Sequence, residues 1–214
     1  MFSPPSSPLS LKSPEAIAER TAALDLPHVA PLVDWLQERK ATLAKLLQLP
    51  EVQLPLFDPF SGGVHTQVLL LLESPGPKAS AGKGSGFISC DNNDQTAKNV
   101  FLTLQEADLP RSQVMCWNVV PWYLHEVRKP NRQELNLGMQ ELRLLLPLLS
   151  ELQVVVLHGK AAQEGWKLLP YKVQEAHKIL EVGHPSPTNF NTRPLERQKL
   201  LQAYQQAAQH IRDT

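Results

Sequence analysis

The chain has 214 residues and balances 21 Lys and Arg against 21 Asp and Glu, so no uniform positive field marks it as a binder of polyanions. Hydrophobic residues make up 42%, and no apolar run approaches the ~20 residues that a membrane-spanning helix needs. The two cysteines, Cys90 and Cys116, form no disulfide framework, and no secretory signal is visible. We therefore expect one compact, monomeric, cytoplasmic domain that is not an integral membrane protein.

The N-terminal part of the chain predicts a tail and two helices. Residues 1–14 contain five Ser and four Pro, a composition that cannot bury enough apolar surface to offset the entropy of ordering. We predict a flexible tail there and a single domain over 15–214. Ser13 and Pro14 are typical of a helix start, and that helix should end near Leu24. Apolar residues at helical spacing predict a second, amphipathic helix, so that the two helices occupy residues 15–48.

Four short apolar segments predict the strands of a buried parallel sheet. They are too brief for typical helices and do not alternate with polar residues: Val68–Leu72, Val114–Trp117, Val154–Leu157 and Ile179–Val182. Helical patterns follow at Gln95–Ala107, with Asp94 as its cap, and at 134–149, 161–168 and 195–211. This alternation predicts an α/β fold, a three-layer αβα sandwich around a central, mainly parallel four-stranded sheet that starts near residue 67.

Polar residues stand where the predicted strands end. Glu73 follows the first strand, Asn118 ends the second, His158 ends the third and His184 follows the fourth. In an open parallel sheet, ligands bind beyond the carboxyl ends of the strands, so these side chains should meet at one edge. Each residue alone fits a loop-capping role, and for His158 we expect a solvent-facing strand end. Their convergence favours a functional site.

Other site patterns are incomplete. The Gly- and Lys-rich loop over residues 76–86 has five residues between Gly76 and the Gly82-Lys83 pair, and Gly84 follows, which is not the nucleotide-binding pattern. It fits either a mobile surface loop or a backbone that approaches a ligand or DNA phosphate. The cysteines lack metal-ligand spacing, so we expect no metal and no metal cluster. A serine nucleophile elbow follows directly after a strand, whereas the Gly-rich segment around Ser85 does not. We therefore do not expect an acyl-transfer hydrolase.

The strand-end segments resemble those of the uracil-DNA glycosylase superfamily, in the same order along the chain. Leu72-Glu73-Ser74-Pro75-Gly76 resembles the family's first motif, and Phe87 resembles the aromatic residue that stacks on the base. Asn118 resembles the Asn at a strand end, and the His-Pro-Ser-Pro loop is intact at residues 184–187. The resemblance covers roughly Gln67 to the C-terminus.

The resemblance implies a DNA glycosylase that hydrolyses the N-glycosidic bond of uracil, or of a related deaminated base flipped out of DNA, in base-excision repair. Its partner would be damaged DNA, and it would need no cofactor. Glu73 would position the attacking water or stabilise the sugar cation, and His184 would donate a hydrogen bond to uracil O2. The Asn118 amide would pair with N3–H and O4, and the Phe87 ring would stack on the base.

The resemblance also implies further contacts. Ser74, Gly76 and Ser186 would bind the substrate, and Phe190 would fill the space that the flipped base leaves. The remaining contacts would be to DNA, from Lys78, Lys83, Pro185 and Pro187. Residues 153–199 carry seven Lys and Arg against four Asp and Glu, which suits phosphate contact and equally suits ordinary surface.

Two departures from the family pattern leave alternatives open. Ser74 stands where the most active branches carry Asp or Asn, and Leu72 stands where Gly usually opens the motif. The branch with Glu in this motif carries four cysteines for an iron-sulfur cluster, which this chain lacks. Activity could therefore be weak or directed at another lesion. One alternative is a catalytically silent protein that binds damaged or single-stranded DNA, and another is an enzyme that acts on a free nucleoside or nucleotide. For Glu73, the alternative to catalysis is a salt bridge with a loop lysine such as Lys78.

Overall fold

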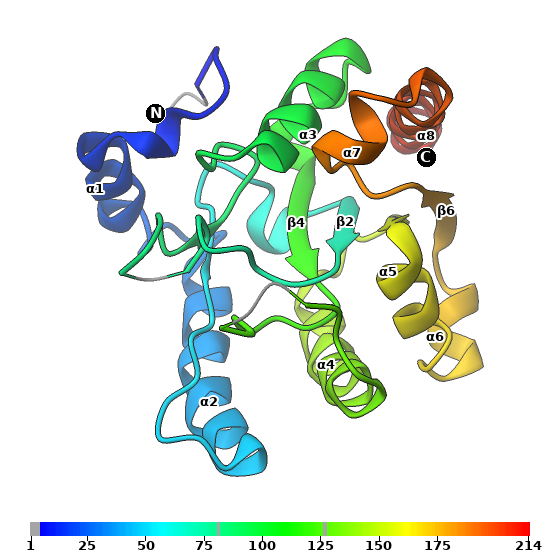
Figure 1. Ribbon diagram of the computed structural model, residues 1–214. Coiled ribbons are helices and arrows are strands. Elements are labelled where there is room, and N and C mark those ends of the chain that lie inside the picture. Colours follow the sequence, from blue (N-terminus) through cyan, green and yellow to red (C-terminus); the bar gives the residue numbers. More distant parts are fainter. Residues whose placement is uncertain (1–4, 81, 126–127) are drawn as a thin grey trace.

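The fold is built on a sheet of four parallel strands. The computed structural model describes residues 5–80, 82–125 and 128–214 (Figure 1). The strand order is β4-β2-β5-β6, with bounds Val114–Asn118, Val68–Leu72, Val154–His158 and Lys178–Val182. All three pairings are parallel, which confirms the predicted α/β fold and its four-stranded sheet. The central strands read as continuous apolar runs because helices cover both of their faces.

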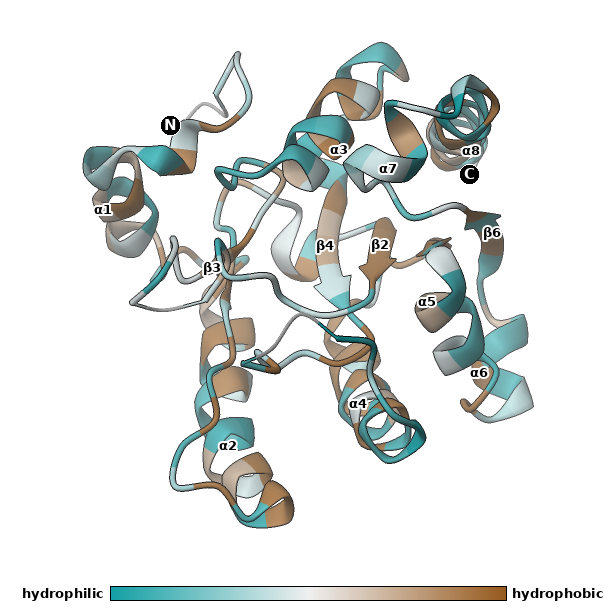
Figure 2. Ribbon diagram, in the orientation of Figure 1, coloured by the Kyte–Doolittle hydropathy of each residue, from teal (hydrophilic) through white to brown (hydrophobic). Residues whose placement is uncertain are grey.

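Helices cover one face of the sheet from three parts of the chain. They are α2 (Ala30–Leu47), α4 (Arg132–Leu145) and α5 (Gly159–Trp166). Leu69 and Leu71 of β2 point to this face and share a buried apolar cluster with all three helices. Figure 2 shows β2 as hydrophobic along its length, while the helices carry a hydrophobic and a hydrophilic side.

The other face is covered by α3 (Gln95–Glu106) and α8 (Pro194–Asp213), and Val68 and Leu70 of β2 belong to the buried cluster on this side. Successive strand residues thus point to opposite clusters, as strand geometry requires. Figure 1 shows α3 and α8 on the opposite side of the sheet from α4. The predicted three layers are confirmed.

Local sequence explains where several helices begin and end. Asp94 caps α3, as predicted, because its carboxylate accepts the backbone N–H of Ala97 at 2.9 Å. The helix predicted over 134–149 is α4, which begins two residues earlier because Asn131 and Glu134 form a capping box. It ends at Leu145, and a 3-10 turn, η4 (Leu146–Leu148), carries Pro147, which has no backbone N–H to donate.

The remaining elements are short. Two-residue strands β1 (Leu56–Phe57) and β3 (Phe87–Ile88) pair in parallel as a separate small sheet, which the sequence analysis does not predict. The others are η1 (Ser10–Lys12), α1 (Pro14–Ala22), η2 (Gly63–His65), η3 (Arg111–Gln113), α6 (Tyr171–Glu175) and α7 (Pro187–Phe190). Across the described ranges, no helix combines the length and the apolar character that crossing a membrane requires.

The N-terminal segment is partly fixed to the core, unlike the flexible tail predicted over residues 1–14. Residues 1–4 lie outside the described part of the chain. Leu11 is 3% exposed, and its N–H donates to the Asp91 carbonyl oxygen at 3.1 Å. The buried Leu11 side chain fixes this turn. The prediction differs because the average composition of residues 1–14 does not show the effect of a single apolar residue.

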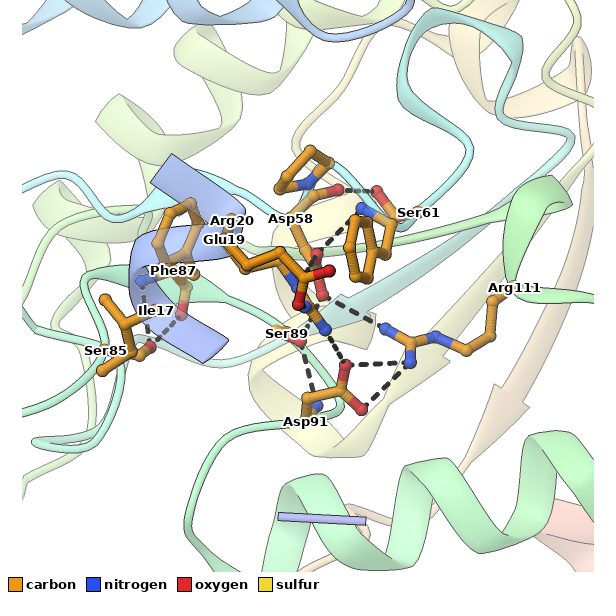
Figure 3. A network of polar contacts seen from close by, with 12 residues as sticks. Ile17, Glu19, Arg20, Asp58, Ser61, Ser85, Phe87, Ser89, Asp91 and Arg111 are labelled. Carbon is orange, nitrogen blue, oxygen red and sulfur yellow. Dashed lines mark hydrogen bonds and ion pairs between the residues drawn. The ribbon is translucent and has the colours of Figure 1, made fainter. Parts of the chain in front are cut away.

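A buried network of charged groups attaches α1 to the core (Figure 3). Arg20 is 1% exposed and donates to Asp58 at 3.0 Å and to Asp91 at 2.7 Å. Arg111 binds the same two carboxylates, at 3.1 Å and 2.9 Å. Two guanidinium groups thus balance two carboxylates, and the Arg20 guanidinium also lies 3.6 Å from the centre of the Phe60 ring. The network therefore joins helix α1 to the core.

Candidate functional site at the carboxyl ends of the strands

A cavity of about 410 Å³ lies at the carboxyl ends of β2 and β4. This size is within the range of ~300–1,000 Å³ that is usual for small-molecule sites. Its walls come from β2 and β4 where they end, from the loops that follow them, from β3 and the segment after it, from the start of α3 and from the loop after β6. The position agrees with the strand-end rule for parallel sheets.

Six of the residues predicted for the site line this cavity. They come from three separate parts of the chain and are Glu73, Ser74, Gly76, Lys78, Asn118 and His184. The other predicted residues do not line it: Phe87, Lys83, Pro185, Ser186, Pro187 and Phe190. The structure therefore brings together the carboxylate, the amide and one of the two imidazoles.

Glu73 supplies a carboxylate that is free to act on a ligand. Its side chain is half-buried, and within the described ranges it forms no hydrogen bond or ion pair, so the proposed salt bridge to Lys78 is not formed. Burial raises the pKa of Glu73, and the charge of Lys129 opposes that rise. The backbone holds it in place, because the Glu73 carbonyl accepts the N–H of Val120 at 3.0 Å.

Asn118 supplies an amide at the end of β4, in register with Leu72 of β2. The residue is only 5% exposed and faces the cavity. In the part of the chain that the structure describes, its side chain has no hydrogen-bond partner. An amide offers both donors and an acceptor, so Asn118 is ready to read a polar edge of a bound molecule.

His184 is partly buried, and burial lowers the pKa of its imidazole. The neutral ring, with one N–H donor and one acceptor nitrogen, is therefore the favoured form in the cavity. A hydrogen bond holds its loop: the Asn99 amide of α3 donates to the Pro185 carbonyl at 2.9 Å. Gly159 lies close by, and a Cβ added there would come within 3.0 Å of the His184 Cβ, so a larger residue would crowd the loop.

His158 is not the solvent-facing residue that we expect from sequence. It is fully buried, with Nε2 2.9 Å from the Tyr204 hydroxyl and Nδ1 3.3 Å from the Leu71 carbonyl oxygen. Burial is the main cause that lowers the pKa of His158 to about 3. The expectation is wrong because α8 covers this strand end, which local sequence does not reveal.

Phe87 also differs from its expected place. Its ring is buried in the small sheet and does not line the cavity, whereas the next residue, Ile88, does. Neighbouring strand side chains point to opposite faces, so Phe87 and Ile88 cannot both face a bound base. The aromatic ring on the cavity wall is Tyr123, which the sequence analysis misses; a signal for it is its position in the loop directly after the Asn118 strand end.

The cavity also includes groups that were not predicted. Cys90 and Cys116 both line it, and burial raises the pKa of Cys116 to about 12, so this thiol stays protonated at neutral pH. Arg128 lines the cavity, and Lys83 lies 5.8 Å from the centre of the Tyr123 ring. Arg128 is paired with Glu134 at 2.6 Å, while Lys78 also lines the cavity and is exposed. Among the described residues, no group of three His, Cys, Asp or Glu side chains could hold a metal ion.

The segment after His184 forms the short helix α7. Ser186 is its N-cap residue, and its carbonyl oxygen accepts the N–H of Phe190 at 2.8 Å. The Phe190 ring packs partly buried against the cluster between the sheet, α3 and α8, with the Arg197 guanidinium 5.7 Å from its centre. In this position it is a packed side chain and not part of the cavity wall.

The family match of this chain covers the whole cavity. A sequence model described as the Uracil DNA glycosylase superfamily matches residues 59–209, which include every residue that lines the cavity. A search of curated proteins found no match.

Proposed function

The chain belongs to the uracil DNA glycosylase superfamily, and from this premise we propose that it hydrolyses the N-glycosidic bond of uracil or a related deaminated base in DNA. One observation carries the proposal: Glu73, Asn118 and His184, from three strand ends, line one cavity. A base must leave the helical stack to enter such a cavity. The fitting process is base-excision repair.

Asn118 and the cavity wall would recognise the base. The unpartnered amide can accept the uracil N3–H and donate to O4, so pairing satisfies both its donor and its acceptor. Ile88 and Tyr123, both less than a tenth exposed, offer apolar surface for the base faces. Ile88 and Tyr123 would thus contact the base in place of Phe87, whose ring does not line the cavity.

His184 would stabilise the leaving base. As the bond between C1′ and N1 breaks, its electron pair goes to the base, and negative charge develops on O2. The neutral His184 ring can donate its N–H there, in a partly buried site where such a bond is stronger than in water. A neutral imidazole suits this step, because it stabilises the charge on O2 through a hydrogen bond and keeps its proton.

Glu73 would act on the sugar side of the reaction. The carboxylate can stabilise the positive charge on the sugar and orient a water. The water oxygen forms the new bond to C1′ while Glu73 accepts the water's proton, which then passes through solvent to the anionic base. The raised pKa of Glu73 brings it closer to neutral pH, which suits a group that accepts a proton. The exposed side chains of Lys78 and Lys83 would contact phosphates.

The proposal is tested with purified protein and end-labelled oligonucleotides that contain one uracil, hypoxanthine or xanthine. Alkali cuts any abasic site, so excision appears as a shortened strand. We expect product with wild type, and a loss of about 100- to 1,000-fold in His184→Ala. Glu73→Gln should also lose activity, while Glu38→Gln, an exposed carboxylate on α2, should not. No product from wild type on any substrate refutes the proposal; retained binding would then indicate a silent DNA-binding protein.

A further inference from the structure

The hydrogen bonds of His158 define a single form of its ring. The Leu71 carbonyl can only accept, so the Nδ1 that lies 3.3 Å away must carry the proton. Nε2 is then an acceptor, and the Tyr204 hydroxyl, 2.9 Å away, must donate to it. Both side chains are fully buried, and burial favours the neutral imidazole that this pattern requires. The pair is thus a fixed, directional connection between β5 and α8.

This connection is close in the chain or in space to both candidate catalytic residues, Glu73 and His184. Leu71 of β2, whose carbonyl accepts from His158, is two residues before Glu73, which follows the strand. On the other side, Gly159 follows His158 directly, at φ +81°, and its backbone packs so closely that a Cβ there would lie 3.0 Å from the His184 Cβ. The His184 charge also contributes to the lowered pKa of His158.

Neither His158 nor Tyr204 lines the cavity, so neither can touch a bound base. An apolar pair of the same size would fill this space, but it would not fix the rotation of a ring or the spacing of two strand ends. Hydrogen bonds in a buried site do both, because they are directional and costly to leave unmade.

We propose that His158 and Tyr204 are positioning residues that hold Glu73 and His184 at the spacing that base excision requires. Tyr204 fixes the His158 ring to α8. The ring then holds the end of β2 through Leu71, and the Gly159 backbone supports the His184 loop. The inference rests on the proposed glycosylase function and adds two residues that act through others.

Tyr204→Phe is the sharpest variant, because it removes one hydroxyl and keeps the ring. Thr66→Val is its matched control: Thr66 is also fully buried, and its hydroxyl donates to the Gly63 carbonyl at 2.7 Å, away from the cavity. We expect Tyr204→Phe to lower the single-turnover excision rate by about 10- to 100-fold with little change in DNA affinity. Thr66→Val should lower the unfolding midpoint similarly and keep the rate.

Nitrogen NMR of the histidine rings provides a readout that does not need activity. In wild type, His158 should be neutral with the proton on Nδ1, and Tyr204→Phe should shift the ring signals of both His158 and His184. His158→Gln, which keeps a donor and an acceptor, should retain more activity than His158→Leu. Unchanged His184 signals and an unchanged rate in Tyr204→Phe would overturn the inference. If wild type excises no base, the proposed function fails, and the NMR signals alone decide whether the pair positions His184.

Discussion

The side-chain amide of Asn99, on α3, donates a hydrogen bond of 2.9 Å to the backbone carbonyl of Pro185, the residue after His184. Asn99 is 2% exposed, and its own side-chain oxygen accepts from Gln95 at 2.8 Å. This contact fixes the loop that carries His184 to a helix that packs on the sheet. It gives the His-Pro-Ser-Pro loop a structural partner 86 residues away in the chain.

Asn99→Asp should loosen the His184 loop. The two side chains have the same shape, but an ionised Asp cannot donate to the Pro185 carbonyl. An unsatisfied buried acceptor costs about 1–3 kcal/mol, and the buried charge adds to this cost, so the free energy of unfolding in urea should fall by at least that amount. The excision rate should fall as well. Gln95→Ala, which removes only the outer contact, should have a smaller effect on both; equal effects would contradict the role assigned to Asn99.

Glu73→Gln should stabilise the protein at neutral pH while it removes activity. Burial raises the pKa of Glu73, so the folded state binds its proton more tightly than the unfolded state does. The contribution to stability is therefore fully present below the ordinary glutamate pKa and is lost as pH rises through the raised value. Urea unfolding at about pH 4 and about pH 7 should show a gain for the variant only at the higher pH. A gain at both values would indicate a packing effect.

His158 should make the fold sensitive to acid. Its pKa is lowered to about 3, so the unfolded state binds this proton first as pH falls. Its stability contribution is fully present above the ordinary histidine pKa and is lost as pH falls toward 3, by up to about 1.4 kcal/mol per pH unit. His158→Gln should show a smaller loss of unfolding free energy between about pH 6 and about pH 4. An equal loss in both proteins would assign the sensitivity to other groups, including His184.

Much of the site could be predicted because the strands are buried on both faces and therefore appear as continuous apolar runs. The strand-end rule then places Glu73, Asn118 and His184 at one edge. It cannot give the direction in which Phe87 points, because that depends on pairing with Leu56 in a strand of only two residues. The burial of His158 depends on Tyr204, 46 residues later in the chain. Such long-range packing leaves no local signal.

Arg20→Ala should be strongly destabilising. Among the described residues, it leaves Arg111 alone to balance the carboxylates of Asp58 and Asp91, both at most 2% exposed. Breaking a buried pair in this way typically costs about 3–5 kcal/mol. Arg197→Ala is the matched control, because Arg197 pairs with Glu106 at the surface and should cost about 0–1 kcal/mol. Urea unfolding measures both variants, and a cost for Arg20→Ala as small as for the control would show that the network adds little.

Lys78→Ala and Lys83→Ala should weaken DNA binding through charge alone. Both side chains are exposed; Lys78 lines the cavity, and Lys83 lies over the Tyr123 ring on its wall. Each phosphate contact that is lost should reduce the slope of log affinity against log salt by about 1, whatever the base in the cavity. Fluorescence anisotropy over a range of salt concentrations measures this slope. Lys45→Ala, at the far end of α2, should leave it unchanged, because Lys45 is exposed and does not line the cavity. An unchanged slope in both Lys78→Ala and Lys83→Ala would mean that DNA approaches the cavity from another side.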